Sequence, residues 1–171
     1  MKCRPKTLVP FGFLLGCLLG GVAIWMSGLA VNLTPSLPLG LYLRVDRNSV
    51  EVGDLVAFCP PEESAEAPRK AGLLIQGSCA SGTLPLLKRV TAKGEGLVEV
   101  RPTGIYLDGS WIQSPAPEVG LTRWRIGRHR LVRDHLWLSA DRPRSWDSRF
   151  FGPIHRDRVL GVYRSLWTWW P

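Results

Sequence analysis

The first pattern of hydrophobic residues along this chain is an uninterrupted apolar stretch near the N-terminus. Residues 8–31 contain no charged side chain, and a run of that length can cross a bilayer as a helix. Three basic residues precede the stretch, whereas residues 32–43 carry no charge. The positive-inside rule therefore places residues 1–7 in the cytoplasm and everything beyond the stretch on the periplasmic side of the inner membrane, with a single pass.

Three alternatives to a retained anchor stay open, one of which is a buried helix of a soluble core, although such a helix is rarely so uniformly apolar. A secretory signal could be cleaved after the small residues at 27–30, and a lipoprotein signal could end at Cys17. The apolar run continues well past Cys17, which is unlike a cleavage site, so we favour the anchor. The domain plan is then a cytoplasmic N-terminus (1–7), a transmembrane anchor (8–31), a periplasmic β-rich domain (32–165) and a Trp-rich C-terminal tail (166–171).

Beyond the anchor, short alternating or apolar runs separated by Gly and Pro predict a mostly β domain. Asp108-Gly109 lies between apolar strand residues and predicts a tight hairpin turn. The segment 60–82, rich in Pro, Glu, Ala and Ser, is interpreted as a surface excursion, and no convincing amphipathic helix interrupts the strands. The predicted strands are 40–45, 54–59, 84–92, 97–101, 105–107, 111–113, 130–132, 136–139 and 159–163.

The net charge and the positions of the cysteines limit the classes of partner and of chemistry that the protein can have. The net charge is +8, but beyond the anchor 19 basic residues face 14 acidic ones, a mild excess that suits phospholipid head groups and does not call for nucleic acid. Cys59 and Cys79 fall in the exported part, where they could form a disulfide or stay as two buried thiols; we favour the disulfide. No CxxC or HxxxH spacing occurs, so we expect no metal and no cofactor.

Two residues are candidates for nucleophilic catalysis. Ser36 comes shortly after the apolar stretch and lies between Pro35 and Pro38. A serine in that position is either a turn residue or a nucleophile close to the membrane surface. Strand alternation places Lys88 on one face with Leu86 and Val90, the better candidate for the core side. Burial would lower the pKa of such a lysine and leave a neutral amine that can take a proton from a serine hydroxyl. The alternative is a lysine that snorkels at a strand edge.

A polar stretch at 139–152 supplies the remaining candidates. Asp147 and Arg149 could form an ion pair that fixes the loop, and Ser145 could form a hydrogen bond with an amine. By composition alone, however, the stretch is only a polar loop that leads to aromatic residues.

Four motifs in order resemble the signal peptidases of the Ser–Lys type, over residues 32–163. They are Thr-Pro-Ser-Leu-Pro-Leu-Gly-Leu-Tyr at 34–42, Gly-Asp-Leu-Val-Ala-Phe at 53–58, Leu-Lys-Arg-Val at 87–90 and Ser-Trp-Asp-Ser-Arg-Phe-Phe-Gly at 145–152. Ser-x-Pro-x-Gly-x-Tyr and Cys-Pro-Pro are most similar to the TraF-type peptidases of conjugative transfer, which mature pilin. The chain departs from the family at 94–96, where Gly-Glu-Gly stands in place of the usual Gly-Asp, and at Pro143.

The resemblance implies a role for each candidate residue. Ser36 is the expected nucleophile and Lys88 its base, while Thr34 would complete the oxyanion hole beside the Ser36 backbone N–H. Ser145 would orient the lysine, with Asp147 and Arg149 in structural roles. The implied fold is a signal-peptidase-like twisted β-sheet domain on one N-terminal transmembrane helix.

The expected activity is therefore cleavage of a membrane-tethered, pilin-like precursor at the phospholipid bilayer, with or without cyclisation of the product. A non-catalytic envelope adaptor and a general type I signal peptidase are the alternatives. A Ser–His–Asp triad is disfavoured, because no Gly-x-Ser-x-Gly motif occurs. The three tryptophans near the C-terminus are suited to the lipid–water interface, with core packing or contact with a neighbouring subunit as the alternatives.

Overall fold

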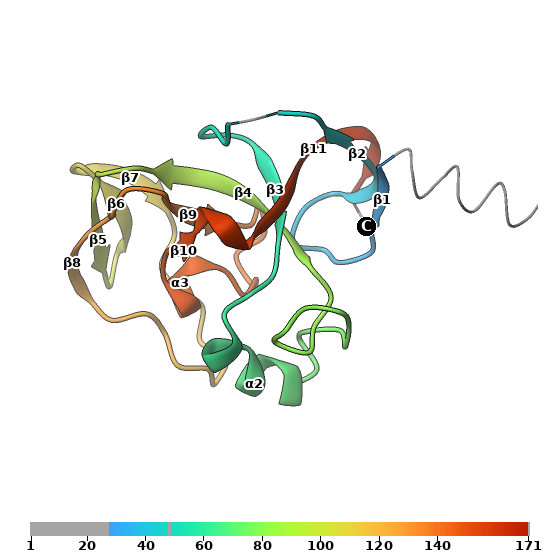
Figure 1. The fold of residues 1–171 in the computed structure, drawn as a ribbon. Coiled ribbons are helices and arrows are strands. Elements are labelled where there is room, and N and C mark those ends of the chain that lie inside the picture. Colours follow the sequence, from blue (N-terminus) through green and yellow to red (C-terminus); the bar gives the residue numbers. More distant parts are fainter. Residues whose placement is uncertain (1–27, 48, 171) are drawn as a thin grey trace, which may run out of the picture.

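Two antiparallel β-sheets form the framework of the protein in a computed structural model that describes residues 28–47 and 49–170 (Figure 1). The larger sheet has the strand order β1-β2-β11-β3-β4-β9-β10, and the smaller one has the order β7-β6-β5-β8. Figure 1 shows the smaller sheet at the opposite end of the molecule from β1 and β2. The larger sheet comprises β1 (Leu29–Asn32), β2 (Leu39–Val45), β3 (Leu55–Phe58), β4 (Leu86–Lys93), β9 (His135–Ser139), β10 (Ile154–His155) and β11 (Val159–Trp169). The smaller comprises β5 (Leu97–Arg101), β6 (Gly104–Leu107), β7 (Ser110–Gln113) and β8 (Gly127–Arg130).

The mostly β fold expected from the sequence is confirmed, and most strands lie within a few residues of their predicted positions. The hairpin between β6 and β7 turns at Asp108 and Gly109, which both have positive φ (47° and 82°). Two successive residues with positive φ define the tight turn that matches the twist of paired strands, and Asp-Gly tolerates it. Here a local sequence signal was sufficient to place the turn, while the pairing beyond it contains a register shift between Ile105 and Tyr106.

Several predicted boundaries were wrong because tertiary pairing extends strands beyond their local signals. Residues 29–31, assigned to the end of the anchor, belong to β1 and pair with β2. Residues 166–169, assigned to a separate tail, continue β11 along β2 as far as Trp169. The predicted strand 130–132 lies earlier, as β8, and β10 was not predicted. The excursion 60–82 contains a nine-residue helix, α2 (Glu62–Lys70), which the sequence analysis missed.

The extended β11 explains a glycine in the first motif. Gly40 in β2 pairs with Thr168 and has φ +140°. A Cβ at this position would lie 2.1 Å from the Trp167 carbonyl oxygen, so any other residue would force the two strands apart. Gly40 therefore permits the close approach of the C-terminal strand to the segment that carries Ser36.

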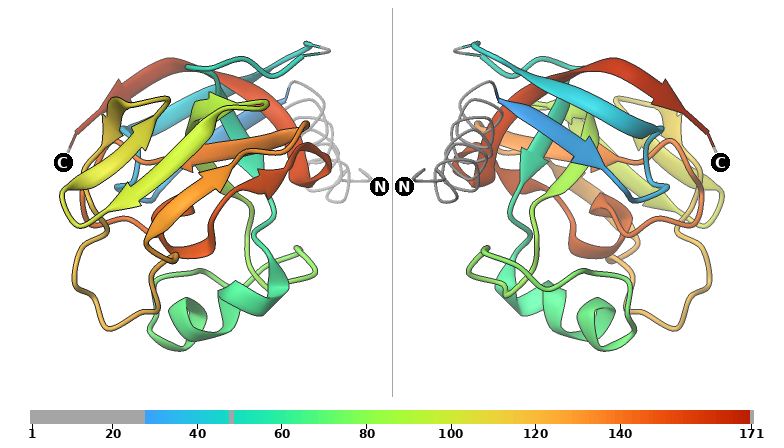
Figure 2. Two further views of the ribbon diagram at one scale, coloured as in Figure 1. Left: turned by 90° about the vertical axis from the view of Figure 1, so that its left-hand side faces the viewer. Right: turned by 90° about the vertical axis from the view of Figure 1, so that its right-hand side faces the viewer.

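Two hydrophobic clusters form the core. One lies under the larger sheet, contains Phe58, Val90, Leu138 and Phe151, and extends to Leu74 beyond α2. The other joins the smaller sheet to β4 and β9 through Trp137. Figure 2 shows α2 and its adjoining loop at one end of the larger sheet, away from the C-terminal end of β11.

The predicted anchor falls almost entirely outside the described residues. Among residues 28–47 and 49–170, no helix has the length and apolar character needed to cross a membrane. The anchor at 8–31 stays a prediction, apart from its last three residues, which are strand.

Candidate active site

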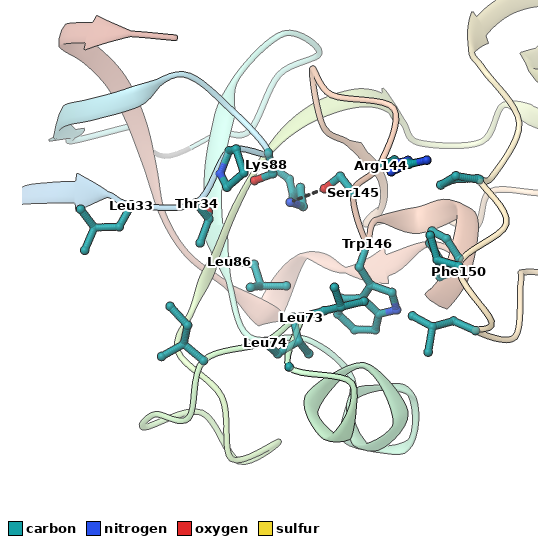
Figure 3. A pocket seen from close by; sticks show the side chains of 17 residues that line it. Leu33, Thr34, Leu73, Leu74, Leu86, Lys88, Arg144, Ser145, Trp146 and Phe150 are labelled. Atoms are coloured by element: carbon teal, nitrogen blue, oxygen red, sulfur yellow. Dashed lines mark hydrogen bonds between the residues drawn. The ribbon is translucent and has the colours of Figure 1, made fainter. Parts of the chain in front are cut away.

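Lys88 projects from the middle of β4 into the interior. It pairs with Val56 of β3, and its neighbour on the same face, Val90, is fully buried. Only 4% of Lys88 is exposed, so the core-side position predicted from strand alternation is confirmed and the snorkelling alternative is wrong. The ammonium group donates a hydrogen bond to Ser145 Oγ at 3.1 Å (Figure 3).

Burial lowers the pKa of Lys88 from 10.5 to about 8, because the charged ammonium loses its hydration. The carboxylates of Asp147 and Asp141 oppose this shift, and the Arg149 guanidinium reinforces it. Desolvation outweighs all these charges. A lysine with a pKa near 8 exists in part as the neutral amine at physiological pH, which is the form a general base requires.

The loop that carries Ser145 is fixed by a buried ion pair. Asp147 and Arg149 are 0% and 1% exposed at the side chain, with Nε and Oδ1 2.8 Å apart. Asp147 also accepts hydrogen bonds from Gln113 Nε2 and from the backbone N–H groups of Ala140 and Arg149, and it caps the short helix α3 (Ser148–Phe151). Arg149 in turn donates to four carbonyl oxygens, those of Ser114, Pro115, Pro143 and Ser145. The pair therefore ties the Ser145 loop to the segment after β7.

Ser36 lies in the turn between β1 and β2, and one buried side chain organises that turn. The Asn32 amide donates to the carbonyl oxygens of Thr34, Leu37 and Pro38 at 3.0–3.2 Å. Its Oδ1 accepts from the Thr34 backbone N–H at 3.2 Å and from the Thr34 hydroxyl at 2.9 Å. Asn32 is thus the centre of a hydrogen-bonded turn that sets the backbone on both sides of Ser36.

Two further contacts hold the same turn from outside. The Tyr42 hydroxyl donates to the Pro38 carbonyl at 2.6 Å, and the Asp141 backbone N–H donates to the Ser36 carbonyl at 2.9 Å. Burial, with Asp141 as a second cause, raises the pKa of Tyr42, so its hydroxyl stays protonated and remains a donor. The Pro-x-Gly-x-Tyr spacing of the first motif therefore has a structural reason: it returns the chain so that the tyrosine supports the turn.

The two loops meet at an apolar cleft that has two adjoining cavities of about 450 and 320 Å³. Ser36, Lys88 and Thr34 line both cavities, and Ser145 lines the larger one. In Figure 3, Lys88 and Ser145 lie on one side of the larger cavity, across from Leu73 and Leu74. No hydrogen bond joins the Ser36 hydroxyl to the Lys88 amine within the described residues. The apolar residues common to both cavities are Leu33, Leu73, Ile75 and Leu86.

The far wall of the cleft is built by residues 60–82, here called the cap. Cys59 and Cys79 form a disulfide that closes the base of the cap, so the favoured pairing is confirmed and the two-thiol alternative is wrong. After α2 the cap returns through residues 72–75 along the cleft and then forms a short hairpin, with a bridge between Gln76 and Thr83. An excursion that the sequence analysis interpreted as surface loop therefore contributes to the candidate site.

The structure brings together the candidates that the sequence pointed to, and it adds others. Ser36, Lys88, Thr34 and Ser145 surround one cleft, with the expected ion pair of Asp147 and Arg149 behind them. The roles assigned to them by resemblance stay predictions. The residues missed by the sequence analysis are Asn32, Gln113, Leu73 and Ile75. Of these only Asn32 had a local signal, since an asparagine two residues before a turn residue commonly bonds to its backbone.

Comparison with known proteins identifies the family. The sequence profile described as "Signal peptidase, peptidase S26" matches residues 6–170. The chain belongs to the peptidase S26 signal peptidase family. Members of this family are serine peptidases, and the cleft just described lies within the matched region.

The chain is also similar to several named proteins of conjugal and plasmid transfer. The chain is 38% identical to "Probable conjugal transfer protein TraF" of Sinorhizobium fredii, over 87% of this chain and 82% of that protein. It is 36% identical to "Conjugal transfer protein TraF" of Agrobacterium tumefaciens (90% and 95% covered) and 31% identical to "Plasmid transfer protein TraF" of Escherichia coli (90% and 94%). Among solved structures, a signal peptidase I of Enterococcus faecalis matches 67% of this chain and 97% of that one, at 19% identity and a TM-score of 0.41.

Proposed function

We propose that this signal peptidase is a membrane-bound serine endopeptidase with a Ser–Lys dyad, in which Ser36 is the nucleophile and Lys88 the general base. One observation carries the proposal: the one lysine buried among the described residues lies in the same cleft as Ser36, with a pKa lowered to about 8. A structural lysine would gain nothing from such desolvation, whereas a catalytic base needs it.

In the proposed mechanism, neutral Lys88 takes the proton of the Ser36 hydroxyl as the oxygen attacks the scissile carbonyl. The bond to the leaving amine then breaks, and that amine takes the proton from Lys88. The resulting ester on Ser36 is released by water, or by an amine of the substrate itself, which would close the product into a ring. The hydrogen bond to Ser145 holds the Lys88 amine in place within the cleft throughout.

The oxyanion would be held by the Ser36 backbone N–H and the Thr34 hydroxyl. In the resting enzyme the Thr34 hydroxyl donates to Asn32 Oδ1, so it must rotate toward the substrate to serve. The Thr34 backbone N–H also bonds to Oδ1 and keeps Asn32 engaged during that rotation. Asn32 would thus keep the Thr34 hydroxyl close to the reacting atoms until the substrate binds.

The proposed substrate is an exported precursor tethered in the membrane, specifically a pilin-like subunit of a conjugation apparatus. The relatives named as conjugal or plasmid transfer proteins support the conjugative role. The apolar cleft beside Ser36 suits an extended, largely apolar peptide segment. Residues 8–27, with basic residues before them, would anchor the enzyme in the inner membrane with its catalytic domain in the periplasm.

The bilayer is proposed as a second partner through an apolar face at the end of the larger sheet. Trp167 and Trp169 are 67% and 46% exposed and lie side by side, with ring centroids 4.9 Å apart. Trp167 pairs with Leu41, and Leu41 pairs with Val31, which is 59% exposed. Tryptophan prefers the interface between lipid and water. Replacing both tryptophans by serine in the full chain should lower the quenching of tryptophan fluorescence by brominated lipids in vesicles.

The deciding experiment expresses wild type, Ser36→Ala and Lys88→Ala with the pilin-like precursor and determines the product mass. Processing by wild type, with loss in both variants, supports the dyad. A mass lower by one further water shows cyclisation. Equal processing in all three proteins would favour the non-catalytic adaptor. Processing of many unrelated exported precursors would indicate a general signal peptidase.

A further inference from the structure

The cap presents two exposed apolar side chains to the cleft, one on each side of a buried leucine. Leu73 and Ile75 are 52% and 54% exposed, and both line both cavities. Leu74, between them, is 7% exposed and packs into the core under the larger sheet. Because Leu74 is buried between them, it fixes Leu73 and Ile75 at the cleft, and these two residues are here called the apolar rim.

The rim is held at each end by specific contacts. The Leu73 backbone N–H donates to the Pro68 carbonyl at 2.9 Å, which joins it to the last turn of α2. The Ile75 carbonyl accepts from the Leu84 N–H at 2.8 Å, which places it at the base of the 75–84 hairpin. The tip of that hairpin is bonded through Cys79 to Cys59, one residue beyond the end of β3.

The rim faces the catalytic candidates across the cleft. Figure 3 shows Leu73 and Leu74 on the side opposite Lys88 and Ser145, with Leu86 between them. Leu33, 76% exposed, stands on the turn that carries Ser36 and lines both cavities as well. An extended peptide lying between the turn and the rim would therefore bury apolar surface on both sides while its scissile bond lies near Ser36.

We propose that Leu73 and Ile75 determine which apolar side chains the enzyme accepts beside the cleaved bond, and that the Cys59–Cys79 disulfide holds them in register with Ser36. This inference rests on the proposed function. Neither side chain carries a group that could take part in proton transfer, so their contribution is to substrate binding. Loss of either rim residue should weaken binding and widen the range of accepted side chains, with little effect on the chemical step.

The test uses the full-length enzyme in vesicles and a pool of synthetic peptides with randomised residues on both sides of a fixed centre. Mass spectrometry of the products identifies the preferred side chains, and the best-cleaved peptide then gives kcat and KM. For Leu73→Ala and Ile75→Ala we expect KM to rise about tenfold each, since about two methylene groups of contact are lost, with kcat within twofold of wild type. Bulkier apolar residues should become acceptable in the space that is freed.

Matched controls separate a rim effect from a general effect of removing exposed apolar surface. Leu160 and Ile126 are 46% and 69% exposed and line neither of the two cavities. Leu160→Ala and Ile126→Ala should leave both KM and the preferred side chains unchanged. The double variant Cys59→Ser/Cys79→Ser keeps both rim residues but releases the hairpin tip, and it should raise KM in the same direction by a smaller factor.

The outcomes distinguish the two proposals. Suppose that the wild-type enzyme cleaves the peptides, that Ser36→Ala does not, and that the rim variants keep the KM and the side-chain preference of wild type. That result would overturn this inference and leave the proposed function intact. A wild-type enzyme that cleaves no peptide and no precursor would instead remove the proposed function, and the inference with it. A fall in kcat with constant KM in the rim variants would also overturn it, because the residues would then act on the chemical step.

Discussion

The two loops that meet at the cleft are held by opposite physical means. The turn around Ser36 is organised by a neutral amide, Asn32, whose side chain bonds to Thr34, Leu37 and Pro38 within the same turn. The loop around Ser145 is organised by a buried ion pair, Asp147 and Arg149, which reaches as far as the segment after β7. Asn32 is here called the neutral tether, because it is uncharged and acts locally. The pair of Asp147 and Arg149 is called the charged tether, because it is ionic and reaches a distant segment.

The difference matters because Lys88 lies between the two loops and responds to charge. The Asp147 carboxylate favours the ammonium form of Lys88, and the Arg149 guanidinium opposes it with a smaller effect, so the two charges that fix the loop act in opposite directions at the amine. The Asn32 amide carries no net charge and holds the other loop without such compensation. Desolvation is left as the main cause of the low pKa of Lys88.

The largest effect is expected on breaking the charged tether. Arg149→Met leaves the Asp147 carboxylate buried without its partner, and we expect a loss of about 3–5 kcal/mol in the free energy of unfolding. The uncompensated carboxylate should also raise the pKa of Lys88, so that the rise of kcat/KM with pH moves to higher pH. Urea unfolding and a pH–rate profile measure the two effects. A loss below 1 kcal/mol would mean that the pair is not what holds the loop.

Removing the positive charge of Lys88, which lies between the two loops, should raise the free energy of unfolding instead of lowering it. A pKa lowered from 10.5 to about 8 means that burying the ammonium costs about 3 kcal/mol. Because the folded-state pKa is the lower one, the cost is fully present below about pH 8 and disappears as the pH rises toward 10.5. Lys88→Met keeps the stem and loses the charge, so it should abolish activity yet raise the free energy of unfolding by up to about 3 kcal/mol at pH 7.

A matched lysine separates this effect from a general effect of charge removal. Lys70, at the end of α2, is 74% exposed at the side chain and pairs with Glu66 on the surface. Lys70→Met should change the free energy of unfolding by less than about 1 kcal/mol at any pH. If Lys88→Met is destabilised at pH 7 and stabilised at no pH, the amine is better solvated than the structure shows.

The same contrast explains what the sequence could predict. Lys88 was found because strand alternation is local and places its side chain on the core face. Local signals also predicted the hairpin at Asp108 and the ion pair of Asp147 with Arg149, since each involves residues close together in the sequence. The disulfide was predicted because both cysteines fall in the exported part of the chain, where oxidation is possible. The cap did not, because Leu73 and Ile75 become part of the cleft only when the chain folds back past α2. For the same reason β1 and the end of β11 were misassigned, since pairing with β2 defines both.

Breaking the neutral tether should cost less stability than breaking the ion pair but should act strongly on catalysis. Asn32→Ala removes every side-chain hydrogen bond at the centre of the Ser36 turn, and we expect a loss of about 1–3 kcal/mol. Displacement of the nucleophile by about 1 Å would lower kcat by about 100-fold. Asn32→Asp keeps the acceptor for Thr34 and loses the donors, so it should be intermediate. A purely structural role would lower the melting temperature of both variants and leave kcat unchanged.

The smallest and most specific effect concerns the hydroxyl that the charged tether positions. Ser145→Ala removes the acceptor of the Lys88 ammonium, and a hydrogen bond to the charged form favours that form, so its loss should lower the pKa of Lys88 further. The rise of kcat/KM should therefore shift to lower pH, while kcat falls about tenfold because the amine is less well oriented. Ser148 is the control: it is also buried, but its Oγ accepts from the Leu138 backbone N–H at 2.8 Å. Ser148→Ala should lose a similar amount of stability without moving the pH profile, and equal profiles for the two variants would show that Ser145 supports the loop and not the amine.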